Sequence, residues 1–416
     1  MASSFEKVCV VGLGYIGLPT AAILATHGLS VTGIDKNPTV VETVNKGKIH
    51  IVEPELEAVV SGVVATGRLK AASAVEAAEV FLIAVPTPLG KNEAPDLSYV
   101  QSAVSDIAPL LVRGNLVILE STSPVGTTEQ VSEGLAKGRP DLTFPHQAGE
   151  LADIQIAYCP ERVLPGQVLH ELVNNDRVIG GMTPRCAERT VGLYTTFVRG
   201  NCLVTDSRTA EMTKLTENAF RDVNIAFANE LSMICDQLRI NVWELIDLAN
   251  RHPRVKILQP GPGVGGHCIA VDPWFIIDSA PEQAKLMRTA REVNDLKPRY
   301  VVRHVRERSA RFSNPVIACL GLSFKADIDD LRESPAVEIV RDLAESVTGE
   351  LLVVEPHIRK LPAVLAGRDH LTLASTEDAI ARADIVLLLV NHRRFRNIDR
   401  RLLLEKVVID TRGMWR

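Results

Sequence analysis

The run Val8-Cys-Val-Val-Gly-Leu-Gly-Tyr-Ile-Gly17 decides the fold of the first part of the chain. Its first four residues are apolar and mostly β-branched, which favours a strand. Three glycines spaced G-x-G-x-x-G follow directly, and a helical pattern over residues 18–27 comes next, with Gly28 placed to end it. A second strand at residues 30–34 ends at Asp35. This order of strand, glycine turn, helix and strand predicts a doubly wound α/β domain that binds a dinucleotide.

Each glycine of the motif has its own task in such a turn. Gly12 permits the sharp turn, Gly14 lets a pyrophosphate approach the backbone, and Gly17 lets the helix pack on the strand. The N–H groups at the helix start favour phosphate. A carboxylate at Asp35 accepts hydrogen bonds from the ribose hydroxyls of NAD and repels the 2′-phosphate of NADP, although the neighbouring Lys36 acts in the opposite direction. The motif therefore predicts NAD as cofactor.

Length and composition bound the class of protein. A chain of 416 residues is too long for one hydrophobic core, so two or three domains are expected. The net charge is −5 and no long basic block occurs, so nucleic-acid binding is not expected. No apolar run approaches the roughly 18 residues of a membrane span. Seven scattered cysteines without C-x-x-C spacing argue against a disulfide framework or a metal site and for a cytoplasmic protein.

Three threonines lie where the ligand of a parallel sheet is expected. Strand-like runs at residues 80–85 and 116–119 each end in a polar loop that contains proline. Ligands of open parallel sheets sit beyond the carboxyl ends of the strands. Thr87 and Thr122 are therefore candidates to line the nicotinamide side of the cleft, and Thr128 could reach a cofactor phosphate. The alternative for each is a turn residue without a ligand.

Another strand-like run, residues 156–159, leads into Pro160-Glu-Arg-Val-Leu-Pro-Gly166. An adjacent acid and base between two prolines is unusual for a plain connection. Glu161 could position or deprotonate a water molecule, and Arg162 could bind an anion. The alternative is that the two form an ion pair on the surface.

The longest helical pattern of the chain covers residues 208–238 and contains neither proline nor glycine. Lys214, Asn218 and Arg221 share one face of this helix, because they are four and three residues apart. Such a row suits an anionic or oxyanionic ligand, and a partly buried lysine can act as a base. Alternatively, this face is solvated and pairs with the glutamates of the same helix.

A glycine-rich stretch reads Gly261-Pro-Gly-Val-Gly-Gly-His-Cys-Ile-Ala-Val-Asp-Pro273. Glycine loses the most backbone entropy on ordering, so such a run marks a sharp turn or the close approach of a ligand. Cys268 follows His267, and Asp272 comes four residues later. The stretch is either a tight turn or the site of a nucleophilic thiol.

The last part of the chain alternates strand-like and helical runs, beginning with a strand at residues 316–320, and predicts a second doubly wound sheet. It lacks G-x-G-x-x-G, so a second dinucleotide is not expected there. Lys325 and Arg332 follow its first strand and suit phosphate or uridine contacts. Solvated loop cations are the alternative.

These patterns predict an α/β protein with two Rossmann-like doubly wound domains joined by a helical central domain. The expected domains are residues 1–206 for NAD, residues 207–309 for the helices and self-association, and residues 310–416 for the second doubly wound sheet. The central part should contain a second long helix over residues 281–309, broken near Pro298.

Three motifs together, G-x-G-x-x-G, the Lys214/Asn218 helix and G-G-x-C-x-x-x-D, resemble the UDP-glucose/GDP-mannose dehydrogenase family, and the resemblance covers essentially the whole chain. It implies oxidation of C6 of a nucleotide-bound hexose from alcohol to carboxylate with two NAD⁺, and a homodimer formed by the central helices. Enzymes of the family that act on UDP-glucose typically carry N-P-E-F-L and G-G-S-C-F-P-K-D.

This chain departs from those two blocks. It has Cys159-Pro-Glu-Arg-Val-Leu-Pro-Gly166 and Gly265-Gly-His-Cys-Ile-Ala-Val-Asp272, together with H-P-R at 252–254 and D-D-L-R-E-S-P at 329–335. In these blocks it resembles the branch that acts on N-acetylated hexosamines, which implies UDP-N-acetylmannosamine as substrate and a role in polysaccharide synthesis.

The resemblance also assigns roles to residues. It implies Cys268 as nucleophile, Lys214 as general acid/base, Asn218 and Asp272 as orienting groups, and Glu161 in hydrolysis of a thioester. Around NAD it places Gly12, Gly14, Tyr15, Ile16, Gly17, Asp35, Thr87, Thr122 and Thr128. Around the sugar nucleotide it places Arg162, Val163, Lys214, Asn218, Arg221, His252, Arg254, Gly265, Lys325 and Arg332. Arg254 is the arginine expected to reach the site of a neighbouring subunit.

Three other functions stay open at this point. The same chemistry could act on UDP-N-acetylglucosamine or UDP-glucose. A two-electron β-hydroxyacid dehydrogenase could share the NAD domain and a helix with lysine and asparagine four residues apart. A non-catalytic protein that binds NAD or a sugar nucleotide is the alternative of another class.

Overall fold

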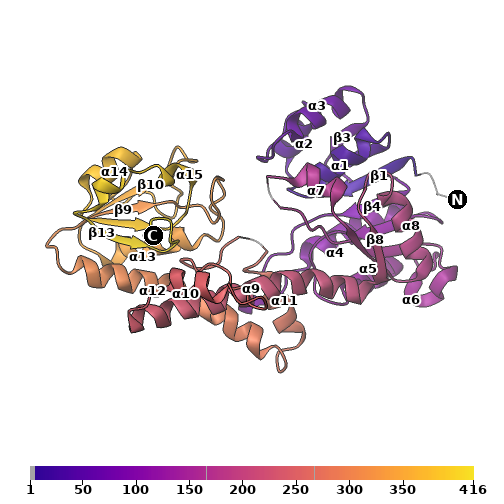
Figure 1. Cartoon of the computed structure of the whole chain (residues 1–416). Helices are drawn as coiled ribbons and strands as arrows, with labels where there is room; N and C mark the ends of the chain where they lie inside the picture. Colours follow the sequence, from indigo (N-terminus) through magenta and orange to yellow (C-terminus); the bar gives the residue numbers. More distant parts are fainter. Residues whose placement is uncertain (1–4, 165, 267) are drawn as a thin grey trace. The chain divides into compact units, whose positions relative to one another are not determined.

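The computed structural model describes residues 5–164, 166–266 and 268–416. Its contacts divide the chain into two compact units (Figure 1). Unit 1 comprises Met1–Glu217 and Trp274–Ser279, and unit 2 comprises Asn218–Pro273 and Ala280–Arg416. The boundaries of the three predicted domains stay predictions.

Unit 1 is built on an eight-stranded sheet with strand order β3-β2-β1-β4-β5-β6-β7-β8. All neighbouring strands pair in parallel except β6 and β7, which pair antiparallel. The strands are β1 (Lys7–Val11), β2 (Ser30–Ile34), β3 (Leu69–Ala72), β4 (Val80–Ile83), β5 (Leu116–Leu119), β6 (Gln155–Tyr158), β7 (Arg177–Gly181) and β8 (Cys202–Asp206).

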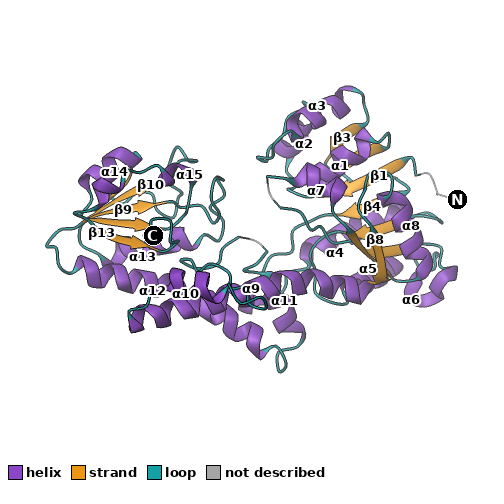
Figure 2. Ribbon diagram, viewed as in Figure 1, coloured by secondary structure: helices purple, strands orange, loops and turns teal. Residues whose placement is uncertain are grey.

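Alternate side chains of these strands enter two separate cores. Val8 and Val10 of β1 pack in one core, and Cys9 and Val11 pack in the other. Both faces of the sheet are therefore covered by helices, as a buried parallel sheet requires (Figure 2). The α-helices of this unit are α1 (Gly17–Thr26), α2 (Pro38–Asn45), α3 (Leu56–Ala65), α4 (Ser98–Ile107), α5 (Thr127–Gly138), α6 (Pro145–Ala148), α7 (Val168–Asn174) and α8 (Pro184–Tyr194). Short 3-10 helices lie at Lys91–Glu93, Ala108–Leu110 and Gly149–Leu151.

Four helices follow in the chain: α9 (Ser207–Leu238), α10 (Val242–Ala249), α11 (Asp272–Ser279) and α12 (Lys285–Ser309). The start of α12 is four residues later than predicted, because a turn in which Gln283 and Ala284 donate to the carbonyl of Ala280 comes first. The predicted break near Pro298 was wrong. Pro298 is buried inside a continuous α12, where packing offsets the hydrogen bond that proline cannot make. Between α9 and α12, buried Arg291 pairs with Asp222 at 2.6 Å.

The last sheet has five parallel strands in the order β11-β10-β9-β12-β13. These are β9 (Val316–Leu320), β10 (Glu350–Val354), β11 (Leu371–Leu373), β12 (Ile385–Leu388) and β13 (Val407–Asp410). Its helices are α13 (Pro335–Ser346), α14 (Thr376–Arg382), α15 (Arg393–Arg396) and a 3-10 helix at Arg400–Leu403. Again alternate side chains of β9 enter two cores, one on each face. The predicted fold class, two Rossmann-like sheets with a helical segment between them in the chain, is confirmed.

Within the described ranges, no helix combines the length and the apolar character needed to cross a bilayer.

Candidate active site

The glycine turn after β1 has the geometry that a dinucleotide requires. Gly12 has φ +97°, and a Cβ built on it would lie 2.4 Å from the carbonyl oxygen of Ala84. A Cβ on Gly17 would lie 1.8 Å from the carbonyl oxygen of Gly12, so helix α1 approaches the turn too closely for any side chain. A Cβ on Gly14, by contrast, would meet nothing within 4 Å. The turn is thus closed towards the protein at two glycines and open at the third, which fits a pyrophosphate over Gly14.

Asp35 lies against this turn. Its Oδ2 accepts from the backbone N–H of Leu13 at 3.2 Å, and its Oδ1 accepts from the N–H of Asn37 at 2.8 Å. The side chain of Lys36 is engaged elsewhere, because its Nζ donates to Ser102 at 2.5 Å and lies 3.7 Å from Asp106. The charge of Lys36, which weakens the prediction of NAD, is therefore partly neutralised by Asp106. The position of Asp35 at the glycine turn fits an NAD ribose.

The predicted threonines fall into two groups. The hydroxyl of Thr87 donates to the carbonyl oxygen of Thr122 at 2.6 Å, so these two loops meet beyond β4 and β5. Thr128 is fully buried, and its N–H and hydroxyl both donate to Oε1 of Glu211, at 2.7 and 2.6 Å. Oε2 of Glu211 accepts from the N–H of Gly126. A carboxylate of α9 therefore occupies the start of α5, where the sequence suggested a phosphate.

The loop after β6 carries Glu161 and Arg162, whose side chains do not form an ion pair with each other. Glu161 is buried, and its Oε2 lies 2.7 Å from Nη1 of the equally buried Arg177. Arg162 instead forms an ion pair with Glu217 of α9 at 2.7 Å. The loop is anchored further by Glu53, whose carboxylate accepts from the N–H groups of Gly166 and Val168. Pro165 lies outside the described residues.

Helix α9 carries the predicted face of Lys214, Asn218 and Arg221, and two of these three residues are half-buried. Lys214 and Asn218 are half-buried, whereas Arg221 is exposed. Nδ2 of Asn218 donates to Oδ2 of Asp272 at 2.5 Å, and Asp272 is 2% exposed. The glutamates that could have neutralised this face, Glu211 and Glu217, bind the α5 start and Arg162 instead.

Cys268 and Asp272 form one helical turn that leads into α11. The carbonyl oxygen of Cys268 accepts from the N–H of Asp272 at 2.8 Å and from that of Val271 at 3.1 Å. The Cys268 residue is exposed and not in a disulfide. The turn and the Asn218–Asp272 bond therefore connect an accessible thiol with the lysine-and-asparagine helix. His267 lies outside the described residues.

The glycines before Cys268 let the chain lie directly on neighbouring segments. A Cβ on Gly265 would be 2.4 Å from the carbonyl oxygen of Glu333, and one on Gly263 would be 2.9 Å from Pro335. Gly266, at φ +86°, contacts the ring of Phe324 in the same way. The predicted Gly265 is thus brought together with the loop after β9 that carries Lys325.

That loop rests on a buried carboxylate that sequence reasoning missed. Oε2 of Glu355 accepts from the N–H groups of Leu322 and Ser323 and lies 3.0 Å from Nε2 of His392. Nδ1 of His392 accepts from the N–H of Asp327 at 2.9 Å, so Nε2 carries the proton given to Glu355. Although burial favours the neutral acid, the hydrogen bond from His392 and those from the two backbone N–H groups lower the pKa of Glu355.

Four further residues of unit 2 are Arg412, His252, Arg254 and Arg332. Arg412, which the sequence analysis missed, adjoins the glycine-rich loop: a Cβ on Gly261 would lie 2.7 Å from its Nη1. The only sequence signal was its position directly after the last strand. His252 and Arg254 are exposed, and Arg332 is exposed and pairs with Asp330 at 2.6 Å.

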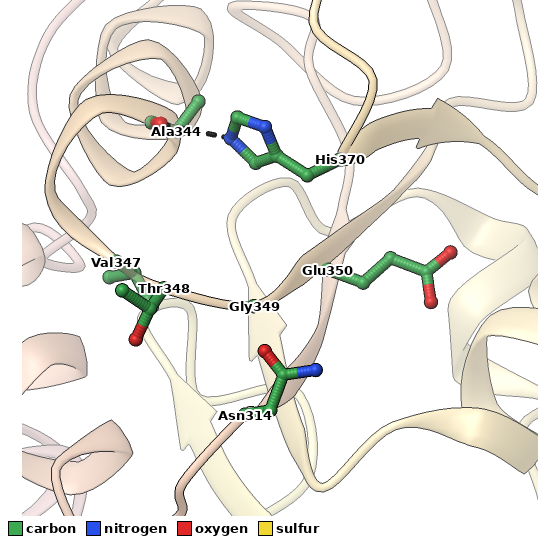
Figure 3. A pocket seen from close by; sticks show the side chains of 7 residues that line it. All are labelled: Asn314, Ala344, Val347, Thr348, Gly349, Glu350 and His370. Carbon is green, nitrogen blue, oxygen red and sulfur yellow. Dashed lines mark hydrogen bonds between the residues drawn. The ribbon is translucent and has the colours of Figure 1, made fainter.

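A separate hollow of about 430 Å³ lies in unit 2 (Figure 3). Its lining includes Asn314, Gly349 and Glu350, which stand at the amino ends of β9 and β10, and His370, whose Nε2 lies 2.9 Å from the carbonyl oxygen of Ala344. Ligands of doubly wound sheets bind beyond the carboxyl ends of the strands. The hollow is therefore on the wrong edge for the substrate.

Comparison with known proteins agrees with this geometry. Residues 6–198, 208–296 and 318–416 match the NAD binding, central and UDP binding domains of the UDP-glucose/GDP-mannose dehydrogenase family. The chain belongs to this family. It is an NAD-dependent nucleotide-sugar dehydrogenase, and NAD is its cofactor.

Three relatives are similar over almost their full length. The NDP-N-acetyl-D-galactosaminuronic acid dehydrogenase of Ralstonia nicotianae is 64% identical over 99% of this chain and 96% of its own. The UDP-N-acetyl-D-mannosamine dehydrogenase of Yersinia pestis is 59% identical over 99% of this chain and all of its own. The structure of the UDP-N-acetylmannosamine dehydrogenase of Pyrococcus horikoshii superposes with a TM-score of 0.89 at 38% identity, over 99% of this chain and 96% of that one.

We predict that Gly14→Ala folds normally but binds NAD about tenfold more weakly, since the added methyl group meets no protein atom and stands where a phosphate would lie. Titration with NADH fluorescence measures the affinity, and thermal unfolding measures stability. Gly12→Ala is the matched control: its Cβ collides with the backbone at Ala84, so it should lose stability as well. Wild-type affinity in Gly14→Ala would contradict the assignment.

Proposed function

We propose that this protein oxidises C6 of UDP-N-acetyl-D-mannosamine to the carboxylate of UDP-N-acetyl-D-mannosaminuronate. The observation that carries the proposal is the exposed Cys268, joined through the helical turn at Asp272 to Asn218 on the helix of Lys214. A dehydrogenase that stops at the aldehyde has no need of a thiol beside these groups. The hexosamine-type blocks of the sequence and the names of the relatives support the choice of sugar.

Removal of the first hydride requires a base for the C6 hydroxyl. Bound NAD supplies the hydride acceptor for each of the two oxidations. Lys214 is the base in our proposal, because it lies half-buried one helical turn from Asn218. The amide of Asn218 is fixed by Asp272 and is placed to orient the C6 oxygen.

The thiol keeps the aldehyde from escaping between the two oxidations. The sulfur of Cys268 adds to the aldehyde carbon, and the resulting thiohemiacetal carries the hydrogen that leaves as the second hydride. The product is a thioester, whose carbonyl carbon water then attacks while the carbon–sulfur bond breaks. Cysteine suits both steps because a thiolate is a good nucleophile and an adequate leaving group.

Glu161 is proposed to take the proton of that water. Its carboxylate is fixed from two sides, by Arg177 through Oε2 and by the N–H of Arg162 through Oε1 at 2.6 Å. Arg162 and Val163, next in the chain, are proposed to contact the sugar nucleotide. Lys325, Arg332, Gly265 and Arg412 are proposed as further contacts of the same ligand. Arg221, His252 and Arg254 complete the proposed substrate contacts.

A second substrate is favoured by one observation. The relative with 64% identity is named for N-acetyl-D-galactosaminuronic acid, not for mannosamine. UDP-N-acetylgalactosamine is therefore the second candidate in the same chemistry.

We predict that the purified enzyme forms two NADH per UDP-N-acetylmannosamine consumed, because C6 passes from alcohol to acid. Absorbance measures NADH, and the assay is repeated with the UDP forms of N-acetylgalactosamine, N-acetylglucosamine and glucose. A stoichiometry of one would indicate a two-electron dehydrogenase. Turnover of another sugar alone would refute the choice of mannosamine, and absence of turnover with all four would favour a binding protein.

We predict that Cys268→Ser retains some first-stage hydride transfer but forms little uronate, because serine is a weak nucleophile without an activating base. Product analysis by mass spectrometry separates aldehyde from acid. Buried Cys235 provides the control, since Cys235→Ser should leave the ratio of acid to NADH unchanged. Normal four-electron turnover in Cys268→Ser would exclude the thiol mechanism.

Self-association through α9 is the second part of the proposal. Phe220, Phe227, Ile234 and Leu238 fall within about 40° on one face of this helix by its 3.6-residue period. They are 67%, 54%, 46% and 60% exposed. An apolar stripe with steps of seven, seven and four residues is typical of helix pairing. A twofold axis would let the stripe cover its own copy in a homodimer.

We predict that Phe227→Asp converts the dimer to a monomer, because it places an unpaired charge at the centre of the stripe. Sedimentation velocity measures the mass in solution. Leu151→Asp is the matched control, since Leu151 is 86% exposed on unit 1 and should not affect assembly. A Phe227→Asp protein that remains dimeric would place the interface elsewhere.

A further inference from the structure

Four buried polar side chains form a cluster beyond the ends of β5 and β6 in unit 1. Glu120 is 2% exposed, Glu161 7%, Arg177 3% and Tyr194 0%. We call them the Glu120 cluster. Only Glu161 has a role in the reaction proposed above, so the cluster contains a second buried carboxylate that the mechanism does not use.

The sheet itself brings the two carboxylates to the same edge. Leu119 of β5 pairs in parallel with Tyr158 of β6, so Glu120 and Glu161 follow neighbouring strands. Tyr158 also pairs with Gly180 of the antiparallel β7. Continuing that register by three residues sets Glu161 beside Arg177, in agreement with their 2.7 Å ion pair.

Tyr194 of α8 connects Glu120 with the ion pair. Its hydroxyl donates to Oε1 of Glu120, and the guanidinium carbon of Arg177 lies 5.3 Å from the centre of its ring. Among the described residues, Oε2 of Glu120 has no hydrogen-bond partner, and neither has Nε of Arg177. Glu120 is thus held by one neutral hydroxyl, whereas Glu161 has a guanidinium and a backbone N–H.

The cluster contains two carboxylates and one cation. In a buried site, one guanidinium balances one negative charge, and a second charge is costly. Glu161 has the guanidinium and a backbone N–H as donors, so Glu120 is the carboxylate that carries the proton. Burial raises the pKa of Glu120 to about 7, with Arg177 and the Tyr194 hydrogen bond opposing and Glu161 adding to the rise. The fourth titratable neighbour, Cys159, stays a neutral thiol, because burial raises its pKa to about 12.

We propose that Glu120 is a positioning residue for the hydrolytic step, which acts on Glu161 through Tyr194 and Arg177. The inference rests on the proposed function, in which Glu161 takes the proton of the attacking water. While Glu120 is protonated, Arg177 pairs with Glu161 alone. When Glu120 ionises, Arg177 is shared between two carboxylates and binds Glu161 less tightly. Thioester hydrolysis then becomes faster as the pH rises through about 7.

The test compares wild type with Glu120→Gln, which is neutral at every pH and keeps an oxygen for Tyr194. Full-length enzyme is mixed with UDP-sugar and excess NAD, and uronate release is followed by rapid quench between pH 6 and 8. We expect wild-type hydrolysis to rise with an inflection near 7, and Glu120→Gln to stay at the low-pH rate, about tenfold slower at pH 8. The KM for NAD should not change. Exposed Glu150→Gln is the control and should keep the inflection.

An inflection that persists in Glu120→Gln overturns the proposal. A second readout is independent of activity: infrared difference spectra between pH 6 and 8 should show one protonated carboxyl that disappears on ionisation and is missing in Glu120→Gln. Absence of that band in wild type also overturns it. Glu161→Gln tests the proposed role of Glu161 separately from that of Glu120. This variant should accumulate the covalent adduct, which intact-mass measurement detects. If it does not, the role of Glu161 is wrong, and the infrared band still reports whether Glu120 titrates.

Discussion

The close packing of backbone on backbone at glycine positions is the constraint on which this structure depends. In unit 1 it is the contact of Gly17 with the carbonyl of Gly12, which sets α1 against the turn after β1. In unit 2 it is the contact of Gly265 with the carbonyl of Glu333, which lays the cysteine loop on the segment after β9. A single Cβ would separate either pair by an ångström or more. The cofactor turn and the loop of Cys268 therefore both require positions without a side chain.

The two sheets use the same turn and then diverge at the acid that follows. Gly321 has φ +95° and donates to Val354, as Gly12 has φ +97° and donates to Ile34. In unit 1 the acid of the second strand remains half-buried at the open turn. In unit 2 the equivalent Glu355 is 4% exposed, and its carboxylate is already occupied by backbone N–H groups and a histidine. This carboxylate therefore fixes the loop after β9.

The sequence predicted well what local patterns determine. The strand at 116–119 is confirmed to the residue because four consecutive buried apolar side chains leave no other choice. Local patterns did not predict side-chain contacts with residues far away in the chain. Nothing in the sequence near Thr128 indicates that its hydroxyl donates to Glu211, 83 residues away. Likewise Pro298 reads as a helix break, yet it is tolerated where Gly263 leaves room for its ring. The catalytic assignments followed from resemblance, which local physics could not replace.

The buried carboxylates of unit 1 differ in the hydrogen-bond donors that surround them. Glu211 accepts three hydrogen bonds at the start of a helix, although burial raises its pKa, and it fixes a loop. Glu161 accepts from a guanidinium and a backbone N–H. Glu120 has only a tyrosine hydroxyl. Three carboxylates with similar burial thus differ in the number and charge of their donors.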